Sequence, residues 1–176
     1  MADFKKPWFV AGGWAIDLYL GRVTRVHKDI EISILRSDQL ALQKYLKTWE
    51  LKKVIPKTGG RMELWVEREF LELPIHEIHG YRANDDPSHL EILLNESSGE
   101  HWKFRRNPAI TRPVSQLGLR SGIGVPILSP EIVLLYKAKE PRLDDEVDFQ
   151  NVFAALDDER RVWLRQAIEV CYPGHE

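Results

Sequence analysis

Apolar and polar positions alternate most regularly between residues 29 and 35. The even positions are isoleucines, and the odd positions before Leu35 are polar, namely Asp29, Glu31 and Ser33. Side chains of a strand point alternately to its two faces, so this pattern predicts a strand with one buried face.

Helical spacing appears on both sides of this strand. Residues Trp14 to Leu20 predict a short helix closed by Gly21. Ser37 is expected to cap a second helix, in which positions 42, 45, 46 and 49 are apolar. Further short strands are predicted at 51–55, 61–66, 74–79, 90–95 and 101–105, the first two as a hairpin, with a loop at 84–88.

The chain becomes helical after Pro126. Ser129, Pro130 and Glu131 supply a cap, a proline at the first helical position and an acid in the first turn. Helices are predicted at 130–139, 144–156 and 158–171, followed by a short tail from Pro173. We expect an α/β protein of the α+β type, with a small mixed sheet at 1–126 and a helical part at 127–176 that closes a cleft.

Composition narrows the function. The 176 residues carry 25 Lys and Arg against 27 Asp and Glu, a formal charge of -2, which argues against a general nucleic-acid binder. We find no membrane-spanning run and no export signal, and Cys171 is the only cysteine. A single cysteine excludes an internal disulfide and a cysteine-based zinc cluster, so we expect a cytoplasmic protein.

The stretch from Gly12 to Glu31 suits a nucleoside triphosphate. Glycines at a helix start let backbone N–H groups approach phosphate, and this assigns Gly12 and Gly13 to nucleotide binding. Asp29 and Glu31 are two residues apart on one strand face, roughly 6.6 Å, so both carboxylates can reach bound Mg²⁺. Each feature alone more often has a structural role. A glycine pair is usually a turn, and two acids at this spacing usually form the solvated face of a strand.

This stretch resembles a known family. Gly12–Asp17 reads Gly-Gly-Trp-Ala-Ile-Asp, and Leu20–Glu31 reads Leu-Gly-Arg-x-Thr-Arg-x-His-x-Asp-Ile-Glu. Both are similar to the signature of the small antibiotic nucleotidyltransferases (aminoglycoside 2″-type and lincosamide), of the polymerase-β-like superfamily. Weaker similarities follow in order at Leu90–Glu96, Trp102–Arg106, Pro130–Lys139 and Asp145–Phe149.

The resemblance implies a metal-dependent enzyme with the nucleotidyltransferase fold. It would move a nucleoside monophosphate from an NTP, ATP in the first instance, to a hydroxyl of a small molecule and release pyrophosphate. Asp29 and Glu31 would hold two Mg²⁺ ions. A third carboxylate would complete the site and help deprotonate the acceptor. We favour Glu91, with Glu96 second.

The sequence departs from the family pattern at two positions. Glu31 stands where the antibiotic enzymes usually have Asp, and Asn95 stands near a strand end where relatives can carry an acid. These departures motivate a second hypothesis, a nucleotide-binding pseudoenzyme without transfer. A third is a toxin-like nucleotidyltransferase acting on RNA or protein.

Basic residues are candidates for binding the triphosphate. Guanidinium groups suit phosphate, which assigns Arg22 and Arg25, although loop arginines are usually just solvated. The family pattern adds Lys137, with Lys139 as a substitute. His27 is expected to orient a carboxylate or to be structural.

The remaining polar residues are less specific. Asp145 and Asp148 are expected to charge a helix start. His76 and His79 would point to opposite faces of one strand, which argues against a shared metal site. Acidic residues, among them Asp85 and Asp86, are compatible with a cationic, aminoglycoside-like acceptor, and are also common for solubility alone.

Overall fold

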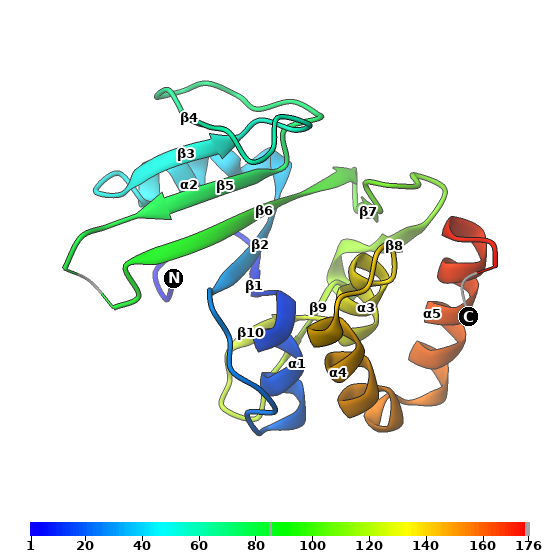
Figure 1. The fold of residues 1–176 in the computed structure, drawn as a ribbon. Coiled ribbons are helices and arrows are strands. Elements are labelled where there is room, and N and C mark those ends of the chain that lie inside the picture. The colour runs from blue at the N-terminus through cyan, green and yellow to red at the C-terminus, as the bar shows by residue number, and fades with distance from the viewer. Residues whose placement is uncertain (85, 175–176) are drawn as a thin grey trace.

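The computed structural model describes residues 1–84 and 86–174, and Figure 1 shows their arrangement. The strands are β1 (Trp8–Val10), β2 (Glu31–Leu35), β3 (Glu50–Val54), β4 (Met62–Leu64), β5 (Glu77–Tyr81), β6 (His89–Ser98), β7 (His101–Lys103), β8 (Thr111–Pro113), β9 (Gly118–Arg120) and β10 (Pro126–Leu128). The helices are α1 (Gly12–Leu20), α2 (Gln39–Tyr45), α3 (Pro130–Lys137), α4 (Leu143–Val152) and α5 (Asp158–Cys171).

The strands form one mixed sheet. Its order is β4-β3-β5-β6-β2-β1-β10-β9, and β7 and β8 continue from the far end of β6. Strand β2 runs parallel to β6 and β1 runs parallel to β10, whereas the other pairs are antiparallel. The predicted mixed sheet with helices is therefore confirmed.

Two cores lie on the sheet. One packs around α2 and includes Ile32, Ile34 and Ile92, and the other includes residues of α1, β10, α3 and α5. Figure 1 shows α3, α4 and α5 grouped together beside α1, away from α2. The proposed division between residues 126 and 127 falls inside β10, and the second core contains Val10 and Ile127 from either side of it.

The prediction that β2 has one buried face is wrong. Ser33 on its polar side is only 2% exposed, and its hydroxyl accepts a hydrogen bond of 2.6 Å from the side-chain amide of Asn95. The strand begins at Glu31, so Asp29 lies in the connection just before it. Polar residues here reflect a buried polar contact and not only exposure to water.

Other elements follow the sequence with shifted ends. The hairpin of β3 and β4 and the three C-terminal helices are confirmed, although α4 ends at Val152 and a short 3₁₀ turn follows. Residues 36–38 form a 3₁₀ turn, so the helix expected after Ser37 begins at Gln39. Strands β1, β8, β9 and β10, of three residues each, lie outside the predicted strands, whereas the equally short β4 and β7 fall within longer predicted runs at 61–66 and 101–105.

The described residues contain no helix with the length and hydrophobicity needed to cross a membrane. The loop predicted at 84–88 and the tail from Pro173 are described only in part, since residues 85, 175 and 176 lie outside the described residues.

Candidate active site

A polar row crosses three neighbouring strands. Glu31 of β2 lies opposite Glu91 of β6, and Glu91 lies opposite His79 of β5. Residues directly opposite in paired strands project from the same face of the sheet. The row therefore brings together two of the predicted carboxylates and a histidine.

Asp29 acts electrostatically on both glutamates of this row. The pKa of Glu31 is raised first by burial and then by the negative charge of Asp29. Burial and Asp29, in the same order, raise the pKa of Glu91 to about 7. The negative charge of Asp29 thus disfavours the ionised forms of both glutamates, and a bound cation would oppose that effect.

A cavity of about 380 Å³ opens beside Glu31. Glu31 and Glu77 line it from the sheet, and five basic side chains line it elsewhere: Arg105, Arg106, Lys137, Lys139 and Arg142. Its volume lies within the range of ligand pockets. The cavity therefore has carboxylates that could bind a cation and, beside them, basic side chains that could bind an anion.

Gly12 lets the helix start approach the carboxylates. It lines the cavity with a φ of +58°, and a Cβ atom built on it would lie 1.5 Å from Oε2 of Glu31. Gly13 has a different surrounding, because a Cβ there would meet Nη2 of Arg25 at 2.2 Å and Cε1 of His27 at 2.6 Å. Only Gly12 of the pair faces the cavity.

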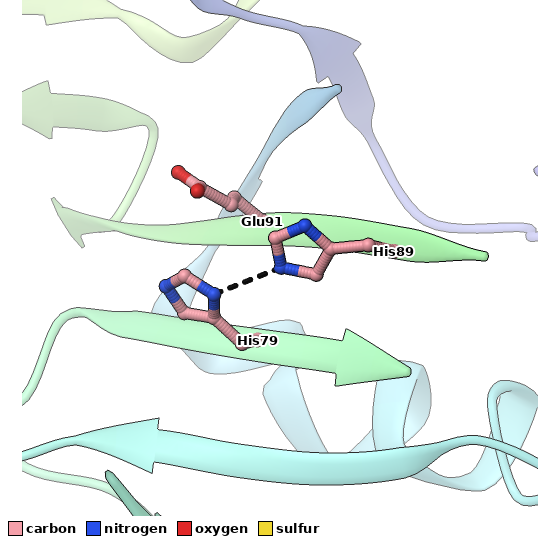
Figure 2. Close-up of side chains that lie close together, drawn as sticks. All are labelled: His79, His89 and Glu91. Atoms are coloured by element: carbon pink, nitrogen blue, oxygen red, sulfur yellow. Dashed lines mark hydrogen bonds between the residues drawn. The ribbon is translucent and has the colours of Figure 1, made fainter. Parts of the chain in front are cut away.

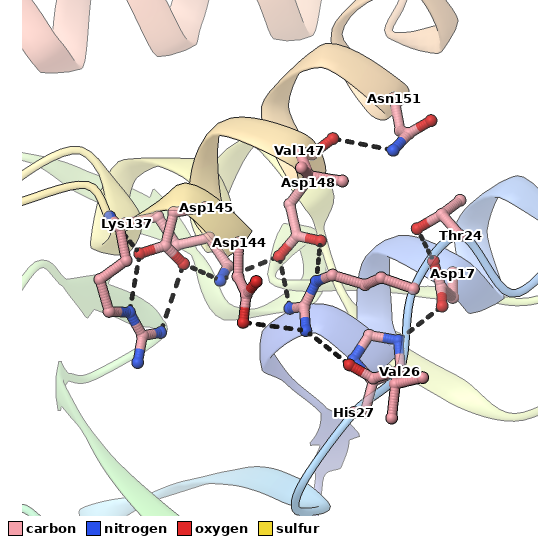
Figure 3. A network of polar contacts seen from close by, with 12 residues as sticks. Asp17, Thr24, Val26, His27, Lys137, Asp144, Asp145, Val147, Asp148 and Asn151 are labelled. Atoms are coloured by element: carbon pink, nitrogen blue, oxygen red, sulfur yellow. Dashed lines mark hydrogen bonds and ion pairs between the residues drawn. The ribbon is translucent and has the colours of Figure 1, made fainter.

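The connection from α1 to β2 is fastened by the buried carboxylate of Asp17. Thr24 Oγ1 donates to Oδ1 of Asp17 at 2.5 Å, and His27 Nε2 lies 2.5 Å from Oδ2, as Figure 3 shows. The ring of Trp14 packs on His27 with centroids 4.5 Å apart. Much of the sequence signature therefore builds a scaffold that places Asp29, and His27 bonds a carboxylate other than the metal candidates.

Arg25 does not line the cavity. Its guanidinium forms a forked pair with Asp148 of α4, with both nitrogen–oxygen distances at 2.8 Å. Arg22 is exposed beyond the far end of α1 and is not among the cavity residues either. The expectation that both arginines contact a triphosphate is therefore not matched by their positions in this structure.

Lys137 reaches the cavity from α3 and is held by two aspartates. Its Nζ pairs with Asp145 and lies 3.0 Å from Oδ2 of Asp148 (Figure 3). Arg142 also pairs with Asp145, at 3.0 Å. Burial raises the pKa of Asp148, but the hydrogen bonds from Arg25 and Lys137 outweigh it and hold that pKa below its usual range. Asp145 and Asp148 thus do more than charge a helix start.

Glu96 lies on the opposite face of the sheet from Glu91, whereas Asn95 shares the face of Glu91 and lines the cavity. Glu96 is an odd number of residues from Glu91 along β6, which places it on the other face, and it accepts from Arg36 at 2.6 Å. Asn95 is buried, and its side-chain oxygen accepts from Trp102 Nε1 at 3.0 Å and from Tyr136 Oη at 3.2 Å. The Asn95 amide therefore takes part in packing. Its departure from the family pattern does not change the pairing of Glu31 with Glu91.

His89 is a polar residue of the site that the sequence reasoning missed. Its Nε2 lies 2.9 Å from Nδ1 of His79, and both rings stand beside Glu91 (Figure 2). The spacing of two between positions 89 and 91 on one strand was the available signal. His76 precedes β5 and lines the cavity instead.

The family model for aminoglycoside-2″-adenylyltransferases matches residues 1–152. The chain belongs to this family. The 2″-aminoglycoside nucleotidyltransferases of Escherichia coli and Klebsiella pneumoniae are each 35% identical to it over 65 residues. Those residues are 37% of this chain and only 32% of the length of these curated relatives.

Solved structures of antibiotic nucleotidyltransferases share the fold. The lincosamide adenylyltransferase LnuA, bound to lincomycin, has a TM-score of 0.56 at 16% identity, covering 85% of this chain and 87% of its own. ANT(2″)-Ia in solution gives 0.54 at 21% identity, covering 94% and 83%, and its complex with adenylyl-2″-tobramycin gives 0.52 at 19%, covering 93% and 88%. The nucleotidyltransferase fold is therefore confirmed.

Proposed function

We propose that this member of the adenylyltransferase family is a Mg²⁺-dependent enzyme that moves AMP from ATP to a hydroxyl of a small acceptor and releases pyrophosphate. The observation that carries the proposal is the pairing of Glu31 with Glu91, because Glu31 lines a cavity that five basic side chains also line. Phosphate groups and divalent cations bind together at sites of this composition.

The donor set fits magnesium. Asp29, Glu31 and Glu91 offer only carboxylate oxygens, which Mg²⁺ prefers, and a bound cation would oppose burial and the charge of Asp29, which raise the pKa of both glutamates. Magnesium bound there would neutralise phosphate charge and lower the barrier to in-line displacement at phosphorus. We assign these three residues as its ligands, with two ions as the expected stoichiometry.

Glu91 has a second role in the proposal. A general base works best when its pKa lies near the working pH, and the pKa of Glu91 is about 7. The ionised carboxylate would accept the proton of the acceptor hydroxyl as its oxygen attacks the α-phosphorus. The bond from that phosphorus to the bridging oxygen breaks, and pyrophosphate leaves with the electron pair.

The basic wall would hold the triphosphate. Lys137 is positioned by Asp145 and Asp148 before any nucleotide binds, so little side-chain freedom is lost on binding. Arg142 also lines the cavity, pairs with Asp145 and lowers the pKa of Glu31 by its charge. Gly12 allows the backbone of the helix start to come close to phosphate.

The acceptor is proposed from the relatives. The relatives are named for aminoglycosides or lincosamides. Two of the solved structures contain lincomycin and adenylyl-2″-tobramycin. We propose an aminoglycoside-like acceptor, because Glu77 in the cavity and the neighbouring carboxylates suit a cationic molecule. Cytoplasmic location, where ATP and Mg²⁺ are available, stays a prediction.

Transfer of label from [α-³²P]ATP to tobramycin or lincomycin tests the proposal. Wild type with Mg²⁺ should label an acceptor, and Asp29→Asn and Glu31→Gln should lower kcat/KM by at least about a thousandfold. Lys137→Met should mainly raise KM for ATP, since it removes a binding charge. Activity that persists in Asp29→Asn would contradict the metal assignment.

A folded chain that binds ATP and labels no acceptor in a wide panel would instead favour the pseudoenzyme. Labelled RNA or protein in the same assay would favour the toxin-like alternative. We favour the enzyme over both alternatives, because Glu31 and Glu91 lie opposite each other on paired strands.

A further inference from the structure

Two histidine rings face each other next to the carboxylate row. Nδ1 of His79 on β5 and Nε2 of His89 on β6 are 2.9 Å apart (Figure 2). One ligand atom from each of these rings and one from Glu91 all lie within 4.8 Å of one another. His79 is 7% exposed, and the other two residues are half-buried.

The orientation of His79 is set from behind by a carboxylate. Its Nε2 lies 2.8 Å from Oε1 of Glu77. A carboxylate can only accept, so Nε2 carries the proton and Nδ1 of the neutral ring keeps a lone pair that points at His89. Carboxylate–histidine pairs of this kind fix the tautomer of metal-bound histidines in proteins.

We propose that His79, His89 and Glu91 form a binding site for a divalent transition-metal ion of the zinc class. Two imidazoles and one carboxylate are a ligand set that zinc takes in proteins, with a fourth position open for water. This site differs from the Mg²⁺ site assigned above to three carboxylates, and the two sites have only Glu91 in common.

The spacing suits such an ion. Metal–nitrogen bonds of about 2.0 Å at a right angle put two nitrogens about 2.9 Å apart, and a tetrahedral angle needs about 3.3 Å. The two nitrogens, 2.9 Å apart, therefore need to move by a few tenths of an ångström at most, and the Glu91 oxygen, within 4.8 Å of a ligand atom of each ring, would turn toward them. On binding, His89 would carry its proton on Nδ1 instead of Nε2, so that Nε2 of His89 and Nδ1 of His79 both offer a lone pair to the ion. Imidazole nitrogen favours zinc-class ions over Mg²⁺, which prefers oxygen.

The neighbouring strands hold both rings in place. The ring of Tyr81 stacks on His89, with centroids 4.8 Å apart and planes at 12°. Its hydroxyl lies 3.4 Å from Nδ1 of His79. Antiparallel pairing puts Tyr81 opposite His89 and His79 opposite Glu91, so the site is built on a rigid ladder and not on a loop.

A transition-metal ion at this site would hold Glu91 away from the Mg²⁺ site. This consequence rests on the proposed function, because Glu91 must serve the transfer reaction for its loss to be felt. Zinc-class ions would then inhibit transfer by occupying a carboxylate that the reaction needs.

Visible absorption of Co²⁺ tests the site without reference to activity. Wild type should bind one Co²⁺ at this site with the intense visible bands of low-symmetry nitrogen and oxygen ligation, and Zn²⁺ should displace it. His89→Phe, which keeps the stacking on Tyr81, should weaken binding about a hundredfold or more. Glu77→Gln should weaken it about tenfold, as expected of a residue behind the ligand.

The controls separate this site from the Mg²⁺ site. His101→Gln changes an exposed histidine at the other end of β6, roughly 30 Å away along the strand, and should leave Co²⁺ binding unchanged. Asp29→Asn should abolish nucleotide transfer and keep Co²⁺ binding. If the proposed function fails, the Co²⁺ result still stands, and if Co²⁺ binding fails, the transfer assay still stands.

Folding of each variant is checked by circular dichroism, and His89→Gln serves if His89→Phe does not fold. Where transfer is active, Zn²⁺ should inhibit wild type much more strongly than folded His89→Phe. The proposal is overturned if folded wild type binds no Co²⁺, if Co²⁺ binding is equal in wild type and the His89 variant, or if Asp29→Asn removes it and His89→Phe does not.

Discussion

Arg25 and Asp148 form a forked ion pair in which both nitrogen–oxygen distances are 2.8 Å. The pair joins the loop before β2 to helix α4 across 123 residues of chain, and Asp148 is fully buried. Arg25 therefore holds the loop that carries Asp29, and its charge is neutralised before any nucleotide binds.

Arg25→Ala should lower the free energy of unfolding by about 3 kcal/mol, because it leaves a buried carboxylate with Lys137 as its remaining ion-pair partner. Arg22→Ala, at an exposed position three residues earlier, should change it by about 0.5 kcal/mol or less. Urea denaturation of the two variants measures the difference. Equal values would show that the ion pair contributes nothing.

Gly12→Ala should disturb the carboxylate row directly. Alanine at a φ of +58° is strained by about 1 kcal/mol, and its Cβ would also displace the carboxylate of Glu31. Gly21→Ala carries the same strain, with a φ of +68° and nothing within 4 Å of the added Cβ. Loss of Mg²⁺-dependent transfer in the first variant and its retention in the second is the expected result.

Magnesium affinity should depend on pH through Glu91. Its pKa of about 7 means that the carboxylate is largely protonated at pH 6 and largely ionised at pH 8. Protons therefore compete with the cation at low pH, and the apparent Kd for Mg²⁺ should fall about tenfold between these pH values. Calorimetric titration at several pH values measures this.

Glu91→Gln is the matched control for that experiment. The amide has the same shape and no proton to lose near pH 7, so Mg²⁺ binding should be weaker and its dependence on pH flatter. An unchanged pH profile in Glu91→Gln would show that a group other than Glu91 causes the pH dependence.

Asn95→Asp should destabilise the chain without improving catalysis. The new carboxylate would be buried, and as an acceptor it could no longer donate to Ser33 as the amide does. We expect a loss of about 2 to 3 kcal/mol in the free energy of unfolding. Asn151→Asp on α4, where the side chain is partly exposed, should cost about 0.5 kcal/mol. Higher transfer activity in Asn95→Asp would instead show that an acid at this position takes part in catalysis.

Local spacing determined much of this protein. The helix after the glycine pair, the three C-terminal helices, the β3–β4 hairpin and the placement of Glu31 on a strand follow from periodicity and end signals within a few residues. These patterns fix backbone torsion angles and the face to which each side chain points. Both depend mainly on residues that are close in the sequence.

Tertiary structure alone decided which distant residues meet. The pairing of β6 with both β2 and β5 brings Glu91 between Glu31 and His79 and sets His89 against His79. Packing of α4 against the loop before β2 likewise takes Arg25 out of the cavity. Strand register and helix packing depend on burial of the whole core, and a one-residue shift would reverse every face, so sequence spacing could not settle them.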